Sequence, residues 1–239
     1  MSLDQRRKIP VVYVRETSEA WTRHRFRATI AKTLDEDCLA PVEERRRMLR
    51  QLAPGNLPPV YNERPGALGR QYDAASISIP RLYGHILFAL ASELRPKATL
   101  EAGSGFGLSG MYLGSALGDV EDAVFFTFEL GDCVGHARDS IARVCPKAFV
   151  IHDSASNFAQ HVASSVQFDL VFLDAVHEYD AIMRDVKLLR GWMSPAATLL
   201  IDDVSYSASS RRAWKEIATM PEVRFSALVN ERLGFVSWQ

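Results

Sequence analysis

The sequence has few cysteines, no long apolar run and almost no net charge. Its three cysteines, Cys38, Cys133 and Cys145, are widely spaced in 239 residues and form no CxxC pair. This excludes a disulfide framework and a zinc site built from thiolates. No run approaches the about 18 apolar residues of a membrane-spanning helix, and the first ten residues lack the apolar stretch of a signal peptide. We therefore expect a cytoplasmic protein with no membrane partner.

Charge is balanced overall but unevenly distributed along the chain. Residues 1–50 hold 12 basic and 8 acidic side chains, whereas residues 51–239 hold 16 and 21. Arg45, Arg46 and Arg47 could contact phosphates, but so small an excess over fifty residues is more typical of a solvated helix face. We expect no nucleic-acid partner.

The first 77 residues contain two predicted helices and one irregular segment. Phe26, Ile30 and Leu34 recur at every fourth position within 17–34, and residues 41–52 are rich in helix formers. The segment 54–77 is rich in proline and glycine, which predicts an irregular loop or a lid over a substrate. We therefore divide the chain into accessory helices (1–53), this loop (54–77) and a main domain (78–239). The accessory helices are a candidate surface for a homodimer.

Helical and strand-like segments alternate in the main domain. We predict helices at 82–94, 107–117, 133–144, 156–164, 179–190 and 209–219. We predict strands at 98–102, 123–129, 148–151, 168–174 and 197–201, followed by two strand-like runs at 223–229 and 234–238. Continuously apolar strands joined by helical crossovers form a parallel sheet covered on both faces, and the last two runs predict an antiparallel hairpin. The predicted fold class is α/β: a doubly wound, mostly parallel, seven-stranded sheet with a closing antiparallel hairpin and an N-terminal helical addition.

A glycine-rich turn follows the first strand of this domain. The sequence LEAGSGFGLS, residues 100–109, leads from the strand into a helix whose free N–H groups can bind a ligand. Leu108 stands where the dinucleotide fingerprint needs its third glycine, which disfavours NAD. Glu101 suits a ligand amino group, and Glu129, at the end of the next strand, suits ribose hydroxyls. These features indicate an amino-acid nucleoside as the ligand.

Five further motifs accompany this turn in order along the chain. They are ISIP (77–80), FEL (128–130), DSA (153–155), FLDAVHEY (172–179) and IDDV (201–204). Together they resemble the class I S-adenosylmethionine-dependent methyltransferases, whose fold is Rossmann-like, and especially the small-molecule O-methyltransferases of the catechol and caffeoyl-CoA type and their bacterial relatives. The resemblance covers residues 78–238.

The resemblance implies a set of residues that bind S-adenosylmethionine. It places Glu101, Gly103 and Ser109 around the methionine moiety, Glu129 at the ribose, and Asp153 and Ser154 beside the adenine, with Gly105, Gly107 and Asp174 completing the cofactor site. For Asp153 and Ser154 an ordinary turn or helix cap is an equal alternative.

Three carboxylates are expected to converge at the carboxyl ends of two neighbouring strands. Asp174, Asp202 and Asp203 each follow such a strand, which is where open α/β sheets bind ligands. Converging carboxylates repel one another unless a proton or a cation intervenes, which favours a divalent ion such as Mg²⁺. The resemblance implies the same metal site, although the catechol type has asparagine at the place of Asp203. The alternative is that Asp202 or Asp203 caps the segment 205–207.

His177 and Asp174 are the predicted catalytic residues. His177 stands where the catechol-type relatives carry the lysine that removes the acceptor proton, and a histidine of near-neutral pKa suits this task, although a lone histidine is often structural. Ionising a phenol of pKa about 10 at pH 7 costs about 4 kcal/mol, whereas an alcohol of pKa near 15 to 16 costs about 12. We therefore expect methyl transfer to an acidic hydroxyl of a small phenolic, catechol-like or natural-product acceptor.

Other acceptors and a non-catalytic role remain as alternatives. A sugar hydroxyl or an amine could accept the methyl group. The segment Asp174-Ala175-Val176-His177 lacks the Asp-Pro-Pro-aromatic pattern of nucleic-acid base methyltransferases, which disfavours that activity. A nucleoside-binding or assembly module of the same fold is the alternative from a different class.

Overall fold

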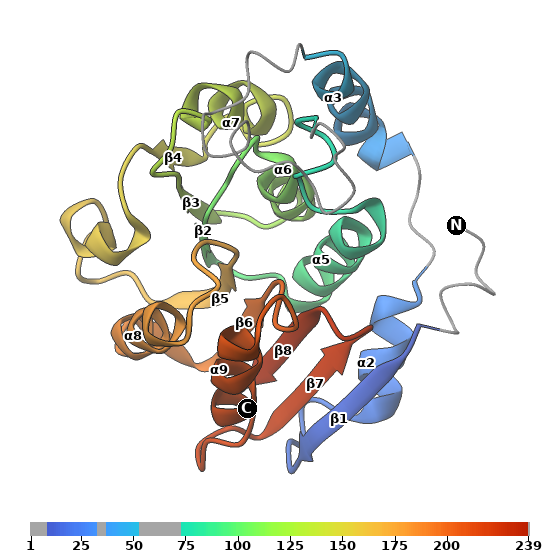
Figure 1. Cartoon of the computed structure of the whole chain (residues 1–239), viewed down its shortest axis with the longest axis vertical. Helices are drawn as coiled ribbons and strands as arrows, with labels where there is room; N and C mark the ends of the chain where they lie inside the picture. The colour runs from blue at the N-terminus through green and yellow to red at the C-terminus, as the bar shows by residue number, and fades with distance from the viewer. Residues whose placement is uncertain (1–8, 33–36, 53–72, 239) are drawn as a thin grey trace.

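The protein is built around one mixed eight-stranded sheet (Figure 1). This computed structural model describes residues 9–32, 37–52 and 73–238. The strands are β1 (Val11–Glu16), β2 (Ala98–Ala102), β3 (Val124–Phe128), β4 (Phe149–Ile151), β5 (Phe168–Leu173), β6 (Met193–Ile201), β7 (Phe225–Val229) and β8 (Leu233–Ser237). They lie in the order β1-β7-β8-β6-β5-β2-β3-β4. The strands from β6 to β4 are parallel, whereas β8, β7 and β1 are added antiparallel.

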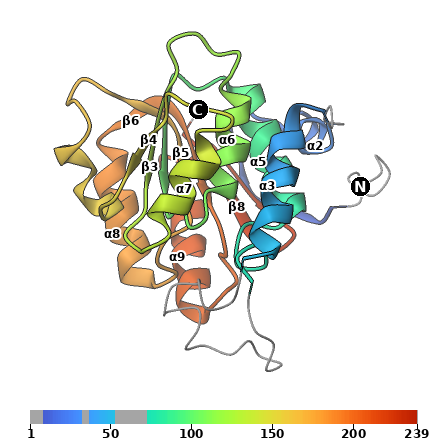
Figure 2. The ribbon, with the colours of Figure 1, turned by 90° about the horizontal axis from the view of Figure 1, so that it is seen from above.

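Helices cover both faces of the sheet (Figure 2). They are α2 (Arg23–Ile30), α3 (Ala40–Arg50), α5 (Arg81–Leu94), α6 (Leu108–Ala116), α7 (Val134–Ile141), α8 (Tyr179–Arg190) and α9 (Ala208–Ala218), with short 3₁₀ helices η1 (Asp37–Leu39) and η3 (Ala155–Gln160). The apolar faces of α2, α3, α5 and α6 share one buried cluster, and those of α8 and α9 share the other with η3. No helix within the described residues is long and apolar enough to cross a membrane.

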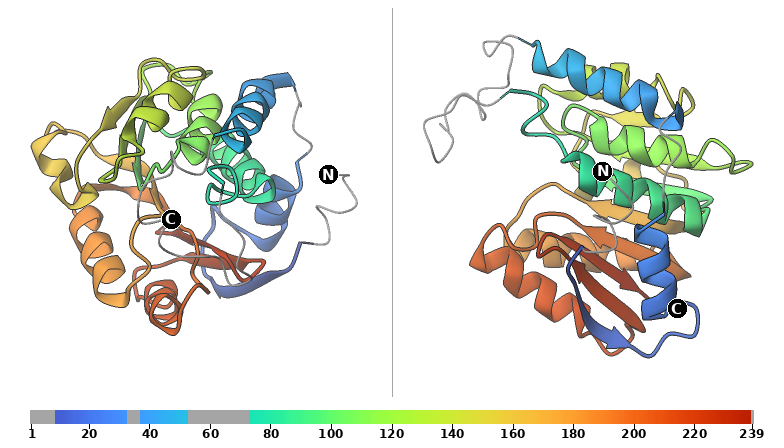
Figure 3. Two further views of the ribbon diagram at one scale, coloured as in Figure 1. Left: turned by 45° about the horizontal axis from the view of Figure 1, so that its top comes forward. Right: turned by 90° about the vertical axis from the view of Figure 1, so that its right-hand side faces the viewer.

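The predicted alternation of helices and strands is confirmed, with three corrections. The sheet has eight strands, because residues 11–16 pair with β7 as an additional edge strand (Figure 3). Alternating burial along these residues is the period-two pattern of a half-buried strand, and the sequence analysis assigned no element there. Among the described residues of 17–34, the predicted helix is confined to α2, and the helix predicted at 156–164 is only the 3₁₀ segment η3.

The N-terminal residues pack into the same core as the rest of the chain. The ring of Phe26, from α2, lies 5.5 Å from that of Phe225 and 4.9 Å from that of Phe235, both on the closing hairpin. Whether residues 1–53 and 78–239 act as separate units stays a prediction. The predicted loop 54–77 lies outside the described residues except for its last five positions.

The solvated helix face expected for Arg45, Arg46 and Arg47 holds only for Arg47, which is exposed on α3. Arg45 and Arg46 are each only 6% exposed, and they share the buried face of the helix with Val42 and Leu49. Arg45 Nε donates to Ser140 Oγ at 2.8 Å, and Arg46 Nη2 donates to the carbonyl of Ile79 at 2.8 Å. Hydrogen bonds of this kind offset the cost of burying a guanidinium.

Candidate functional site

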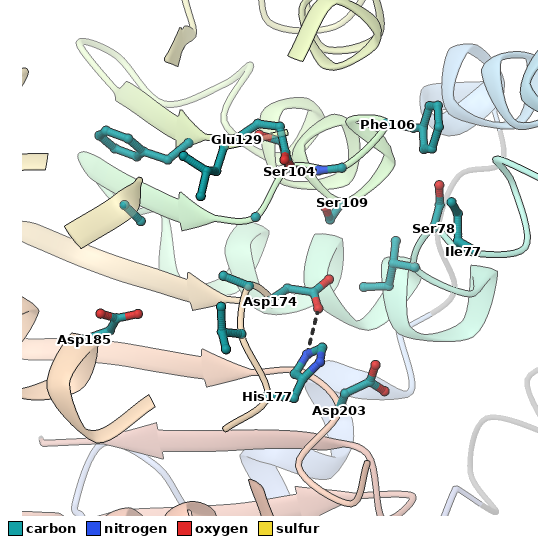
Figure 4. A pocket seen from close by; sticks show the side chains of 18 of the residues that line it. Ile77, Ser78, Ser104, Phe106, Ser109, Glu129, Asp174, His177, Asp185 and Asp203 are labelled. Carbon is teal, nitrogen blue, oxygen red and sulfur yellow. Dashed lines mark hydrogen bonds and ion pairs between the residues drawn. The ribbon is translucent and has the colours of Figure 1, made fainter. Parts of the chain in front are cut away.

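A cavity of about 610 Å³ opens beyond the carboxyl ends of β2, β3 and β5 (Figure 4). Its size falls within the range of small-molecule sites. Most of the residues predicted from the sequence line it: Gly103, Gly105, Ser109, Glu129, Asp153, Ser154, Asp174, His177 and Asp203. Glu101, Gly107 and Asp202 do not line it; Glu101 and Asp202 are fully buried. Segments distant in the sequence therefore meet where the resemblance expects one ligand site.

The glycine-rich turn has a backbone that only glycine adopts without strain. Gly103, Gly105 and Gly107 have φ values of 91°, 51° and 83°. A Cβ on Gly103 would lie 2.1 Å from the carbonyl oxygen of Asp174, and one on Gly107 would lie 2.9 Å from the Cα of Ala137. A Cβ on Gly105 would meet nothing within 4 Å. Close packing therefore requires glycine at positions 103 and 107, whereas position 105 has free space around it at the cavity.

Glu101 presents an unpartnered carboxylate oxygen just behind the turn. Its Oε2 accepts a hydrogen bond from Thr127 Oγ1 at 2.5 Å, and its Oε1 has no hydrogen-bond partner among the described residues. Burial raises the pKa of Glu101 to about 7, against the effect of the Ser109 and Thr127 hydroxyls. A buried oxygen of this kind suits an ammonium group, as the sequence analysis proposed for Glu101.

Glu101→Gln is expected to raise the melting temperature at pH 8 and to change it little at pH 4.5. Because the folded pKa is about 7 and the ordinary value is 4.5, folding takes up a proton between these values, and the wild type loses stability as the pH rises through this window. The glutamine side chain does not titrate, so the variant does not lose stability in this pH window. Thermal unfolding of both proteins at the two pH values measures the difference. Equal melting temperatures at pH 8 would contradict the burial of an ionisable carboxyl group.

Glu129 connects the end of β3 to the glycine-rich turn. Its Oε2 accepts from the backbone N–H of Gly105 at 2.7 Å, and its Oε1 accepts from that of Gly131 at 2.7 Å. Each oxygen retains a second lone pair for a ligand hydroxyl. The position at the cavity agrees with the predicted ribose contact, which stays a prediction.

The Asp153 carboxylate forms hydrogen bonds with neighbouring residues of its own turn. It accepts from Asn157 Nδ2 at 2.9 Å and from the backbone N–H of Ser154 at 2.6 Å, and it lies 2.8 Å from His161 Nε2. The hydrogen bonds from His161 and Asn157 lower the pKa of Asp153. Ser154 is the N-cap of η3. The capping alternative therefore describes these side chains, although both residues also line the cavity.

Asp174, His177 and Asp203 form a cluster in the cavity, beyond the carboxyl ends of β5 and β6. His177 Nε2 lies 3.5 Å from Asp174 Oδ1 (Figure 4), and one ligand atom from each of the three residues lies within 4.8 Å of the others. Burial and the charge of Asp202 raise the pKa of Asp174. Burial alone would lower the pKa of His177, but the neighbouring carboxylates, above all Asp174, outweigh it and raise that pKa. Asp174 and His177 therefore titrate as a coupled pair, in which the Asp174 carboxylate favours the protonated form of the imidazole.

Arg232 is a residue of this site that the sequence analysis missed. It lies in the turn between β7 and β8 and lines the cavity. Its Nε and Nη2 donate to the two oxygens of Asp202 at 2.8 and 2.6 Å, and its Nε lies 3.2 Å from Asp203 Oδ1. In the sequence, Arg232 was only part of a predicted hairpin turn. The one signal that could have pointed to it is that it is the single basic residue of that turn.

Comparisons with known proteins identify a family model and a fold to which the chain is similar. Residues 100–204 match the family model described as a methyltransferase domain. The fold is similar to an O-methyltransferase from Bacillus cereus in complex with S-adenosylhomocysteine (TM-score 0.61, 18% identity, 92% of this chain and 97% of that one). It is also similar to a methyltransferase from Podospora anserina bound to the same compound (TM-score 0.65, 18% identity, 85% and 93%). A third similar structure is an O-methyltransferase from Streptomyces achromogenes involved in tomaymycin synthesis, in complex with S-adenosylmethionine (TM-score 0.55, 16% identity, 92% and 96%).

Comparison with curated protein sequences finds no significant match. The resemblance that the motifs carry is nevertheless confirmed by the family model and by the fold. Residues 100–204 thus match a methyltransferase-domain family model, and the chain as a whole shares its fold with solved methyltransferase structures.

Proposed function

We propose that this protein transfers the methyl group of S-adenosylmethionine to a hydroxyl group of a small molecule. The observation that carries the proposal is the single cavity that brings the glycine-rich turn and Glu129 together with the pair of Asp174 and His177. The Bacillus and Streptomyces proteins of similar fold are named O-methyltransferases, which favours oxygen as the acceptor atom.

His177 is the proposed general base of the reaction. The acceptor hydroxyl loses its proton to the imidazole, the oxygen attacks the methyl carbon, and the bond from that carbon to sulfur breaks to release S-adenosylhomocysteine. Asp174, 3.5 Å from the imidazole, stabilises the imidazolium as it forms. The sulfonium is already a good electrophile, so the remaining task is to align oxygen, methyl and sulfur, which contributes up to about 7 to 11 kcal/mol in favourable cases.

Apolar side chains beside the base favour an aromatic acceptor. Val176 and Tyr206 line the cavity and are 55% and 66% exposed. The Tyr206 ring lies 5.3 Å from the imidazole of His177. An exposed ring and an exposed aliphatic group next to the base offer a surface on which a phenol or catechol can pack.

The Mg²⁺ site implied by the resemblance does not fit the described residues. Asp202 is fully buried, does not line the cavity, and accepts hydrogen bonds from Arg232 with both oxygens. Asp174 and Asp203 are close enough to share an ion with His177, but such an ion would occupy the imidazole that accepts the proton. No step of the proposed reaction is therefore assigned to a metal.

Methyl transfer is tested directly with methyl-labelled S-adenosylmethionine and a panel of catechols, simple phenols, sugars and amines. We expect label in the catechol or phenol products, with stoichiometric formation of S-adenosylhomocysteine. Binding of S-adenosylmethionine, measured by calorimetry, without label in any product and with Mg²⁺ supplied, would instead support a non-catalytic nucleoside-binding module. A homodimer formed through the N-terminal helices and a cytoplasmic location stay predictions.

A further inference from the structure

Arg232 contacts two of the three carboxylates of the site, those of Asp202 and Asp203. Its guanidinium holds Asp202 with two hydrogen bonds of 2.8 and 2.6 Å, and the same Nε lies 3.2 Å from Asp203. The second carboxylate of the cavity cluster, Asp174, belongs to the neighbouring strand end. A guanidinium facing a carboxylate with two parallel N–H groups is the strongest common arrangement of an ion pair.

The backbone fixes Arg232 in this place. Asn230 and Glu231 have φ values of 48° and 56°, so that the β7–β8 turn is tight. The N–H of Val204 then donates to the carbonyl oxygen of Arg232 at 3.1 Å, which extends the pairing of β6 with β8. Arg232 is thereby held beside Asp202 and Asp203 by main-chain bonds as well as by its side chain.

We propose that Arg232 is a built-in cation that takes the place of a divalent metal at this site and makes methyl transfer independent of one. It is a positioning residue: it neutralises the buried Asp202 and holds Asp203 beside His177. The part of the proposal that concerns catalysis rests on the proposed function. The part that concerns metal binding does not.

The positive charge of Arg232 and the burial of Asp202 both disfavour the binding of a divalent ion at this site. The two oxygens of Asp202 are already hydrogen-bonded, and its carboxylate is shielded from the cavity. An ion on Asp203 would lie close to the guanidinium, and like charges a few ångströms apart repel strongly in a partly buried site. Removing the guanidinium would reverse both effects, because it would leave three carboxylates without their cation.

The proposal is tested by titrating Mn²⁺ into the purified full chain and following free Mn²⁺ by electron paramagnetic resonance. We expect no stoichiometric binding by the wild type or by Arg232→Lys, which keeps the charge. Arg232→Met is expected to bind one Mn²⁺ at least about tenfold more tightly than the wild type. Arg224→Met, which removes an exposed arginine, is the matched control and should behave as the wild type.

The measured Mn²⁺ affinities of the wild type and the variants either support or overturn the proposal. One tightly bound Mn²⁺ in the wild type, lost in Asp203→Asn, would overturn it, as would a folded Arg232→Met that gains no affinity. If Arg232→Met does not fold, the double variant Asp202→Asn/Arg232→Met removes the unpaired buried charge, and it should gain affinity through Asp174, His177 and Asp203. Methyl transfer to the phenolic panel is expected to be unchanged after chelation. Should no acceptor react, the proposed function fails, but the Mn²⁺ titration still decides the metal question.

Discussion

His177→Ala is expected to lower kcat by about 100-fold to 10,000-fold and to leave the affinity for S-adenosylmethionine unchanged. Loss of a positioned general base has an effect of this size. The polar neighbour of the imidazole is Asp174, and not Glu129 or the glycine-rich turn, so its removal should not disturb the proposed cofactor contacts. Single-turnover methyl transfer and calorimetry with S-adenosylhomocysteine measure the two effects separately. His24→Ala, at an exposed position of α2, is the matched control and should retain full activity.

The pH dependence distinguishes a catalytic base from a structural histidine. The base must be unprotonated, and the carboxylates around His177 raise its pKa. The rate in the wild type should therefore rise with pH through a value above the ordinary histidine pKa of about 6.5. Asp174→Asn removes the first of these carboxylates, so the rise should move to lower pH while the maximal rate falls. A rate in His177→Ala close to that of the wild type, with the same pH profile, would contradict the assignment.

Gly103→Ala is expected to destabilise the protein by about 2 to 5 kcal/mol and to abolish cofactor binding. The positive φ of 91° costs about 1 to 2 kcal/mol for a residue with a Cβ, and overpacking against the Asp174 carbonyl, only 2.1 Å away, costs about 1 to 3 kcal/mol more. The backbone at Asp174 would have to move, and with it the proposed catalytic pair. Urea unfolding and binding of S-adenosylhomocysteine measure the two losses.

Gly105→Ala is the control for this variant. It lies in the same turn, also at positive φ, but its Cβ would meet no atom within 4 Å. Only the cost of the dihedral angle, about 1 to 2 kcal/mol, is expected in the unfolding free energy. Equal destabilisation in the two variants would show that backbone conformation alone, and not the contact with Asp174, makes Gly103 necessary.

The parts of the fold that could be predicted are those encoded by local patterns. The predicted helix at 179–190 coincides with α8, and the predicted strands from 98 to 174 agree with β2 to β5 within one residue. Apolar periodicity marks the buried face of the helix, and short continuous apolar runs mark strands that are buried on both faces. The edge strand β1 escaped prediction because its six residues pair with β7, which lies more than two hundred residues further along the chain. Nothing near residues 11–16 in the sequence indicates that partner.

In the candidate site, too, the features encoded by local patterns were predicted and the long-range contacts were not. The glycine-rich turn, Glu129 and the pair of Asp174 and His177 were predicted because each follows a strand that ends at the same edge of the sheet, and the cavity brings them together. The prediction that Asp202 would share an ion with Asp174 and Asp203 rested on the same rule. It could not anticipate the side-chain partner of Asp202, which is thirty residues away.

By itself the sequence determined the α/β class, the glycine-rich turn and the strand ends that carry the acidic residues, since these depend on the spacing of residues within short segments. Only the tertiary structure decided the surroundings of the charges. It buried Arg45 and Arg46 against Ser140 and Ile79, and it placed Arg232 between Asp202 and Asp203. A charge in a protein interior is stabilised by whichever opposite charge or dipole the fold brings to it, and those partners come from distant parts of the chain.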